Sequence, residues 1–237
     1  SSSPVISNCW LVSSCNIDAE QNRGRVVRQA LENMLVMQDR MNSRVHENWQ
    51  AQDFEWYRAI WTECAELIEH YGYKWWKKQE ADMEQVRLEV IDIWHFGLSA
   101  LFGNGKSIET IAGEIEAELA NFHASNLGVR EATEALALHA LDTRGFSPSR
   151  FWQLMQASGL DFDALYGAYV GKNVLNFFRQ DHGYKSGTYT KIWAGREDNE
   201  HLAELVLALD KNADDFSEQV YEALKQRYQD TVPQAEG

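Results

Sequence analysis

Apolar residues recur at spacings of three and four along almost the whole chain, from about Asn22 to Gln229, and strand-like alternation is scarce. This spacing is the period of an amphipathic helix. It predicts helices over residues 23–46, 53–72, 80–102, 107–123, 129–142, 149–157, 161–180, 198–210 and 214–229. We therefore expect a single all-α domain, a multi-helix bundle over residues 21–230 with a peripheral helical insertion at about 103–146. Residues 1–20 and 231–237 are expected to be tails, the first of them flexible.

Local signals mark where several of these helices begin and end. Ser147-Pro148 is typical of a helix start, with a serine N-cap followed by a proline in the first turn, and Asp161 can cap its helix in the same way. Gly145 is typical of a helix end. Residues 181–197 interrupt the helical pattern with three glycines and two tyrosines, and we expect an ordered loop there.

The charge and the cysteine content exclude several classes of function. Of the 237 residues, 22 are Lys or Arg and 36 are Asp or Glu, which gives a formal net charge of −14. Such a charge disfavours binding to nucleic acid or to an anionic membrane surface, and no apolar run approaches the roughly 18 residues of a membrane span. The three cysteines are too few for a disulfide scaffold and odd in number. This usage is typical of the cytoplasm or of another reducing intracellular compartment.

A first pair of carboxylates, Glu63 and Glu66, lies three residues apart in the second predicted helix. Successive residues of a helix are rotated by about 100°, which places both at the edge of the apolar stripe and points Glu69 away from it. A solvated charged face explains Glu69 well and Glu63 badly. We therefore expect Glu63 and Glu66 to be half-buried.

A second pair, Glu89 and Asp92, provides the only charged residues between Leu88 and Leu101, in a helix that is apolar almost all round. A buried carboxylate must be paired, protonated or bound to a metal. The adjacent helices offer few basic partners, which favours a metal over a salt-bridge network. Two such pairs on antiparallel helices would form an all-oxygen site suited to Mg²⁺ or Mn²⁺. A di-iron bundle would require Glu-x-x-His, and this motif does not occur in the sequence.

Basic residues gather between Lys172 and Arg196, where five of them accompany a single acid, Asp181. Lys172, Asn176 and Arg179 share one helical face, opposite an apolar one. This pattern fits an ordinary amphipathic helix with a solvated side. It fits equally well a clamp for an anionic substrate, because ammonium and guanidinium groups bind phosphates.

Two amides, Gln38 and Asn42, lie in the centre of the apolar stripe of the first long helix. Buried amides need hydrogen-bond partners. A bond to another helix is the commoner solution, and recognition of a base edge is the alternative. Trp75 and Trp76 follow the second helix, where aromatic side chains belong to the core more often than to a stacking platform.

Three segments of the sequence resemble one known family. WTECAELIEHYGYKWWKK, QVRLEVIDIWHF and GKNVLNFFRQDHGYKSGTYTKIW are similar to motifs of the dimeric dUTP diphosphatases, which belong to the all-α NTP pyrophosphohydrolases. The resemblance covers roughly residues 25–210. The ExxE and ExxD pairs alone mark only the broad superfamily, whereas their combination with GKNxLNxFRQDxGYK is much more specific.

The resemblance implies roles for individual residues. The family's catalytic carboxylates, which hold two or three Mg²⁺ ions with Mn²⁺ as a possible substitute, match Glu63, Glu66, Glu89 and Asp92. Its phosphate-contacting residues match Lys172, Arg179, Tyr184, Lys185 and Lys191. Its nucleoside pocket matches Gln38, Asn42, Trp75, Phe96 and Asn176.

The function that the resemblance implies is Mg²⁺-dependent hydrolysis of dUTP, and also of dUDP, to dUMP by a metal-activated water, in a homodimer. Pyrophosphate would leave from dUTP and phosphate from dUDP. Two other functions stay open: an all-α nucleoside triphosphate pyrophosphohydrolase of different base specificity, and a non-catalytic acidic helical interaction module. The intact carboxylate set disfavours the module, since a scaffold has no need for buried acids.

Overall fold

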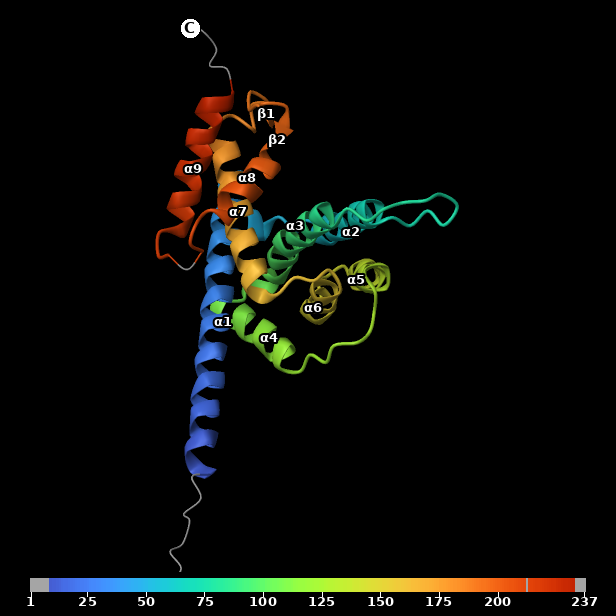
Figure 1. The fold of residues 1–237 in the computed structure, drawn as a ribbon, viewed down its shortest axis with the longest axis vertical. Coiled ribbons are helices and arrows are strands. Elements are labelled where there is room, and N and C mark those ends of the chain that lie inside the picture. Colours follow the sequence, from blue (N-terminus) through green and yellow to red (C-terminus); the bar gives the residue numbers. More distant parts are fainter. Residues whose placement is uncertain (1–8, 212, 233–237) are drawn as a thin grey trace, which may run out of the picture.

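The computed structural model describes residues 9–211 and 213–232, and it leaves out the side chains of residues 9–23, 25 and 104. In these ranges the chain forms nine α-helices and one two-stranded sheet, arranged as Figure 1 shows. The helices are α1 (Cys9–Val45), α2 (Trp56–Tyr71), α3 (Met83–Leu101), α4 (Ile108–Ala120), α5 (Val129–Thr143), α6 (Pro148–Ala157), α7 (Phe162–Asp181), α8 (Asp198–Leu207) and α9 (Phe216–Thr231). All nine predicted helices are present, and the all-α fold class is confirmed.

The N-terminal helix is longer than predicted. Because α1 begins at Cys9, residues 9–20 are helical in the structure, and the part of α1 nearest its start projects beyond the body of the molecule (Figure 1). The flexibility expected of this segment stays a prediction. Of the predicted C-terminal tail, Thr231 is the last residue of α9 and Val232 follows it, while residues 233–237, like residues 1–8, lie outside the described residues.

The loop predicted over residues 181–197 contains a small hairpin. Strands β1 (Ile192–Trp193) and β2 (Arg196–Glu197) pair in antiparallel register. The two residues between them have positive φ values, 46° at Ala194 and 81° at Gly195, as the tightest hairpin turns require. The hairpin places the fully buried Trp193 against α7 and α9, where its ring contacts Phe178 and Tyr228.

The two predicted helix starts are confirmed. The Ser147 hydroxyl accepts a hydrogen bond from the Arg150 amide ahead of Pro148, and the Asp161 carboxylate accepts one from the Ala164 amide. The end of α5 differs, because Arg144 rather than Gly145 takes the left-handed conformation there, with φ of 54°.

The helices α2 and α3 form the antiparallel hairpin that carries the candidate site. The Asp82 amide bonds the His70 carbonyl at 3.0 Å near the connecting loop. Helix α5 packs on α2, while α1 and α7 pack on α3. The core is continuous through all of these helices and is rich in large aromatic side chains; Trp94 of α3, for example, stacks on Phe151 of α6 with ring centroids 4.8 Å apart.

The segment 103–146, predicted to be a peripheral insertion, adds buried side chains to the same core. Ile111 and Ile115 of α4 and Leu136 of α5 are almost completely buried. Whether this segment is an insertion relative to other proteins stays a prediction. Within the described ranges, no helix combines the length and the apolar character that crossing a bilayer demands.

Candidate active site

Three of the four predicted carboxylates meet between α2 and α3. Ligand oxygens of Glu63, Glu89 and Asp92 all lie within 4.8 Å of one another. Glu66 is exposed and outside this group, so the prediction that it is half-buried is wrong. The helical period explains the difference, because Glu66 lies about 120° from the apolar position Ile60 and Glu63 only about 60°.

Crowding of the carboxyl groups changes their proton affinity. Burial, together with a hydrogen bond to Glu89 and the charge of Asp92, raises the pKa of Glu63 to about 8. Burial likewise raises the pKa of Glu89. Burial is the largest cause of both shifts, and the neighbouring charge of Asp92 adds to each. A concentrated set of oxygen donors fits a hard divalent cation such as Mg²⁺.

Two basic side chains reach the cluster. The Lys172 ammonium of α7 lies 3.0 Å from Asp92 Oδ2 and 3.2 Å from Asn199 Oδ1 of α8, and His70 Nε2 lies 3.5 Å from Glu89 Oε1. The salt bridge, which was the less favoured alternative to a metal site, is therefore present at Asp92. This ammonium pairs with only one of the three carboxyl groups, so the salt bridge does not remove the case for a cation.

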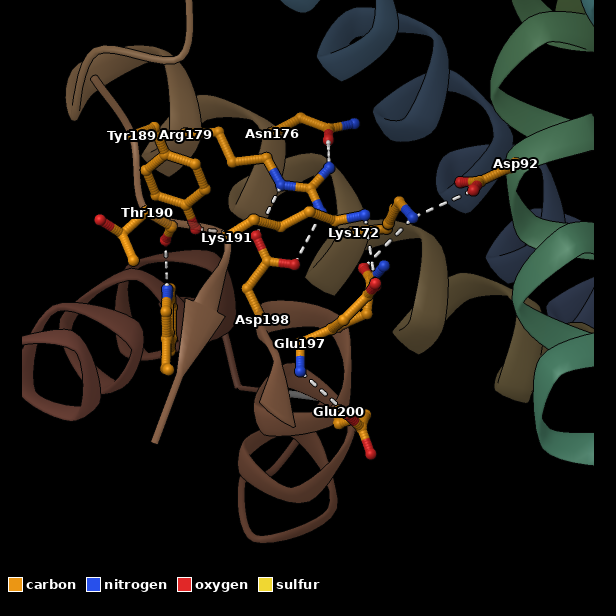
Figure 2. A network of polar contacts seen from close by, with 12 residues as sticks. Asp92, Lys172, Asn176, Arg179, Tyr189, Thr190, Lys191, Glu197, Asp198 and Glu200 are labelled. Atoms are coloured by element: carbon orange, nitrogen blue, oxygen red, sulfur yellow. Dashed lines mark hydrogen bonds and ion pairs between the residues drawn. The ribbon is translucent and has the colours of Figure 1, made fainter. Parts of the chain in front are cut away.

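The basic residues of α7 do not form a solvated face, and that alternative is wrong. Lys172 is 7% exposed, and the Arg179 side chain is 12% exposed. Figure 2 shows how Arg179 is held. Its Nε and Nη2 atoms each donate to Asp198 at 2.8 Å, and Nη1 donates to Asn176 Oδ1 at 3.3 Å. The acidic partner of Arg179 is thus Asp198, the first residue of α8, which lies just beyond the basic segment.

The remaining predicted phosphate contacts lie at the surface of the loop after α7. Tyr184 and Lys185 are exposed, and the Lys191 ammonium pairs with Glu197 at 3.2 Å. The centroid of the Tyr184 ring lies 6.0 Å from Arg179 Cζ. The structure therefore brings Tyr184 near Arg179, and it leaves Lys185 and Lys191 exposed.

The amides of α1 form a hydrogen-bond network between helices. Of the two alternatives, a bond to another helix and recognition of a base edge, the structure shows the first. Gln38 Nε2 donates to Asn42 Oδ1 at 3.0 Å, and Asn42 Nδ2 donates to the Ser99 hydroxyl at 2.9 Å. Gln38 Oε1 lies 2.8 Å from the Tyr169 hydroxyl and 2.9 Å from His95 Nδ1. With the Gln38 oxygen facing His95, the ring carries its hydrogen on Nδ1, because an amide oxygen only accepts. The Tyr169 hydroxyl also lies 2.9 Å from the Met34 carbonyl.

The two predicted aromatic contacts to the nucleoside behave differently. Phe96 is half-buried on α3, with its ring 6.3 Å from that of Trp56. Trp75 is 90% exposed, and Trp76 is 60% exposed. Both tryptophans lie in the loop from α2 to α3, which extends away from the body (Figure 1). The expectation of core packing is therefore wrong for both.

Sequence reasoning missed several residues of the site. Asp198 and Asn199 accept hydrogen bonds from the cations of α7, and both follow the basic segment without a periodic pattern to distinguish them. His95 and Tyr169 orient Gln38. A histidine within an apolar helix is a signal that could have pointed to His95.

The all-α fold, with an acidic cluster on two antiparallel helices and a lysine and an arginine on a third, has the features of the all-α nucleoside triphosphate pyrophosphohydrolases. A family model described as dUTPase matches residues 30–184, which is more than half of the chain. The chain therefore belongs to this dUTPase family, and its activity is that of a dUTP diphosphatase. None of the curated proteins matches the sequence. The match includes the carboxylates, the amides and Arg179, and it ends before Lys191 and Asp198.

Proposed function

We propose that this dUTP diphosphatase requires Mg²⁺ and converts dUTP to dUMP and pyrophosphate, and dUDP to dUMP and phosphate. The observation that carries this proposal is the meeting of three carboxylates within 4.8 Å. Two or three ions would be held by Glu63, Glu89 and Asp92, with Glu66 at the exposed edge, and Mn²⁺ could substitute because it prefers the same oxygen donors. Bound ions would neutralise phosphate charge and lower the pKa of a bound water.

Glu63 is our candidate for the carboxylate that orients or deprotonates the attacking water. Glu89 is buried, and Asp92 is held by Lys172. Glu63 is only half-buried and makes no ion pair with a basic side chain in the described part of the chain. Asp92 is half-buried as well, so Glu63 is distinguished by having no ammonium bonded to its oxygens in the described part of the chain.

Lys172 and Arg179 are our candidates for binding the phosphates. Both lie on the face of α7 that contacts the acidic cluster and α8 (Figure 2). Charge that develops on a leaving phosphate is stabilised best by donors that are already oriented and shielded from water. Tyr184, Lys185 and Lys191 would add contacts from the loop that follows.

Gln38 and Asn42 are our candidates for recognition of the uracil edge, with Phe96 and Asn176 nearer the sugar and phosphates. Phe96 would crowd the 2′ carbon and disfavour a ribose. This role rests on the family resemblance, because the Gln38 oxygen is already bonded to Tyr169 and His95, which leaves one N–H of its amide for a base. The exposed position of Trp75 gives no support to its predicted role in the pocket.

We also propose that the protein is a homodimer in a reducing compartment. The dimer rests on the family resemblance and agrees with the exposure of large apolar side chains such as Leu207 at 88% and Leu138 at 68%. The compartment rests on cysteine usage.

The base specificity is tested by measuring pyrophosphate release from dUTP, dCTP, dTTP and UTP in Mg²⁺. We expect dUTP to be the preferred substrate by at least tenfold in kcat/KM, and dUMP and pyrophosphate to appear in equal amounts. Equal rates with all four nucleotides would replace this proposal with a pyrophosphohydrolase of different base specificity. No turnover of any of them would favour the non-catalytic interaction module.

A further inference from the structure

The carboxylate of Asp198 is the most deeply buried acid next to the candidate phosphate site. It is 0% exposed and stands at the first position of α8, directly after strand β2. Its two oxygens accept hydrogen bonds from Nε and Nη2 of Arg179, each at 2.8 Å (Figure 2). Oδ2 also accepts a bond from the Tyr189 hydroxyl at 2.8 Å. Asp198 therefore accepts all three hydrogen bonds from side chains of the protein, and its carboxylate is not in contact with solvent.

The geometry of the ion pair leaves Arg179 able to bind a second anion. A guanidinium group has five N–H donors. Within the described residues three of them are used: Nε and one on Nη2 by Asp198, and one on Nη1 by Asn176. One donor therefore remains on each of the two terminal nitrogens. Two donors on neighbouring nitrogens are what a phosphate needs for bidentate binding.

The ion pair also fixes the direction in which those two donors point. A free arginine has several rotatable bonds, and a substrate must order them before the guanidinium can bind it in one geometry. A carboxylate bonded to one edge of the planar group orders the side chain before the substrate binds, so the substrate does not have to supply this conformational entropy. Such preorganisation increases transition-state stabilisation, because the donors need not reorient as charge develops.

We propose that Asp198 is a positioning residue, which holds the guanidinium of Arg179 so that its two free N–H groups face a substrate phosphate. This inference rests on the proposed role of Arg179 in phosphate binding. It adds a functional residue beyond the segment 30–184 that the dUTPase family model matches. A purely structural role is the competing explanation, since the same ion pair joins α7 to α8.

A double-mutant cycle separates the two roles. Asp198→Asn keeps the shape of the side chain but presents an amide to Arg179, and we expect kcat/KM for dUTP to fall about 10- to 100-fold, as for other outer partners of catalytic groups. In an Arg179→Ala background the same change should cost less than threefold, because its target is gone. Asp198→Glu, which keeps the charge, should recover part of the activity if Asp198→Asn does not fold.

Two variants serve as controls. Glu204→Gln removes a carboxylate from the same helix that pairs with Arg196 and Arg227, and Tyr189→Phe removes only the other hydrogen bond to Asp198. Both should keep kcat/KM within threefold of wild type. A Tyr189→Phe enzyme as impaired as Asp198→Asn would overturn the inference in favour of loop anchoring.

Two further results would overturn the positioning role of Asp198, and a third would contradict the proposed role of Arg179. Asp198→Asn within threefold of wild type, or an equal loss in the wild-type and Arg179→Ala backgrounds, would show that Asp198 does not act through Arg179. Arg179→Ala within threefold of wild type would contradict the phosphate-binding role on which the inference rests. If Arg179→Ala is impaired and the cycle is additive, only the positioning role fails.

Discussion

His95 should make the stability of this protein depend strongly on pH between 7 and 5. Its ring is 6% exposed and stacks on Tyr169 with centroids 4.3 Å apart. Its Nδ1 hydrogen is used by Gln38, and Nε2 is buried without a hydrogen-bond partner among the described residues. Burial, followed by the charge of Lys172, lowers the pKa of His95 to about 3.

The size and the sign of the effect follow from proton linkage. In the unfolded chain a histidine has a pKa of about 6.5. As the pH falls below that value, the unfolded state binds a proton that the folded state does not take up until about pH 3. The free energy of unfolding then decreases by up to about 1.4 kcal/mol per pH unit, and the loss between pH 7 and pH 5 comes to about 2 kcal/mol.

Denaturant unfolding at the two pH values, with a chelator present throughout, measures this contribution. His95→Asn places an amide nitrogen near the position of Nδ1 and does not titrate. Its packing defect should lower stability equally at both pH values, so the loss between pH 7 and pH 5 should be about 2 kcal/mol smaller than in wild type. His123→Asn, at an exposed position in the loop after α4, should leave the wild-type loss unchanged. Losses within about 0.5 kcal/mol of each other in wild type and His95→Asn would refute the reasoning.

Three other expectations concern assembly, packing and motion. Light scattering at micromolar concentration should give about twice the chain mass of 27.2 kDa, and a monomer would contradict the homodimer. Gly97→Ala should lower the free energy of unfolding by about 1–3 kcal/mol, because a Cβ there would lie 2.5 Å from the Phe146 ring; an unchanged denaturation midpoint would contradict this packing. Hydrogen exchange over residues 181–196 should slow when a non-hydrolysable dUTP analogue and Mg²⁺ are added, because closure over a ligand orders such loops, and unchanged exchange would argue against their role.

The helices could be predicted from the sequence because the spacing of apolar residues and the signals at helix starts are local properties. The i, i+3 spacing of Glu89 and Asp92 in an apolar helix is sufficient to place both carboxylates on one face. The period also orders Glu63 and Glu66 by their distance from the apolar stripe, but it does not give the width of the buried stripe, which depends on how α3 packs on α2. Backbone capping at Ser147 and Asp161 is equally local and equally predictable.

The parts that were missed depend on contacts between distant segments. Asp198 looks like an ordinary acidic helix start, and only the packing of α8 on α7 turns it into the partner of Arg179. The same packing buries Lys172, whose helical face gave equal support to a solvated side. Trp75 was misjudged for a related reason, because hydrophobicity favours burial only where another element is present to cover the side chain.

The most direct test of the central claim is the rate of pyrophosphate release from dUTP by wild type, Glu63→Gln and Glu69→Gln, each in Mg²⁺ and in a chelator. Glu69 lies on the same helix as Glu63, is exposed and pairs with Lys74, so its variant is a matched control for the loss of one carboxylate. We expect turnover by wild type and Glu69→Gln in Mg²⁺, none in chelator, and a loss on the order of 100-fold or more in Glu63→Gln with far-UV helicity unchanged. Turnover in the chelator, or a Glu63→Gln enzyme as active as Glu69→Gln, would contradict the assignment of the carboxylate cluster as the metal-dependent catalytic site.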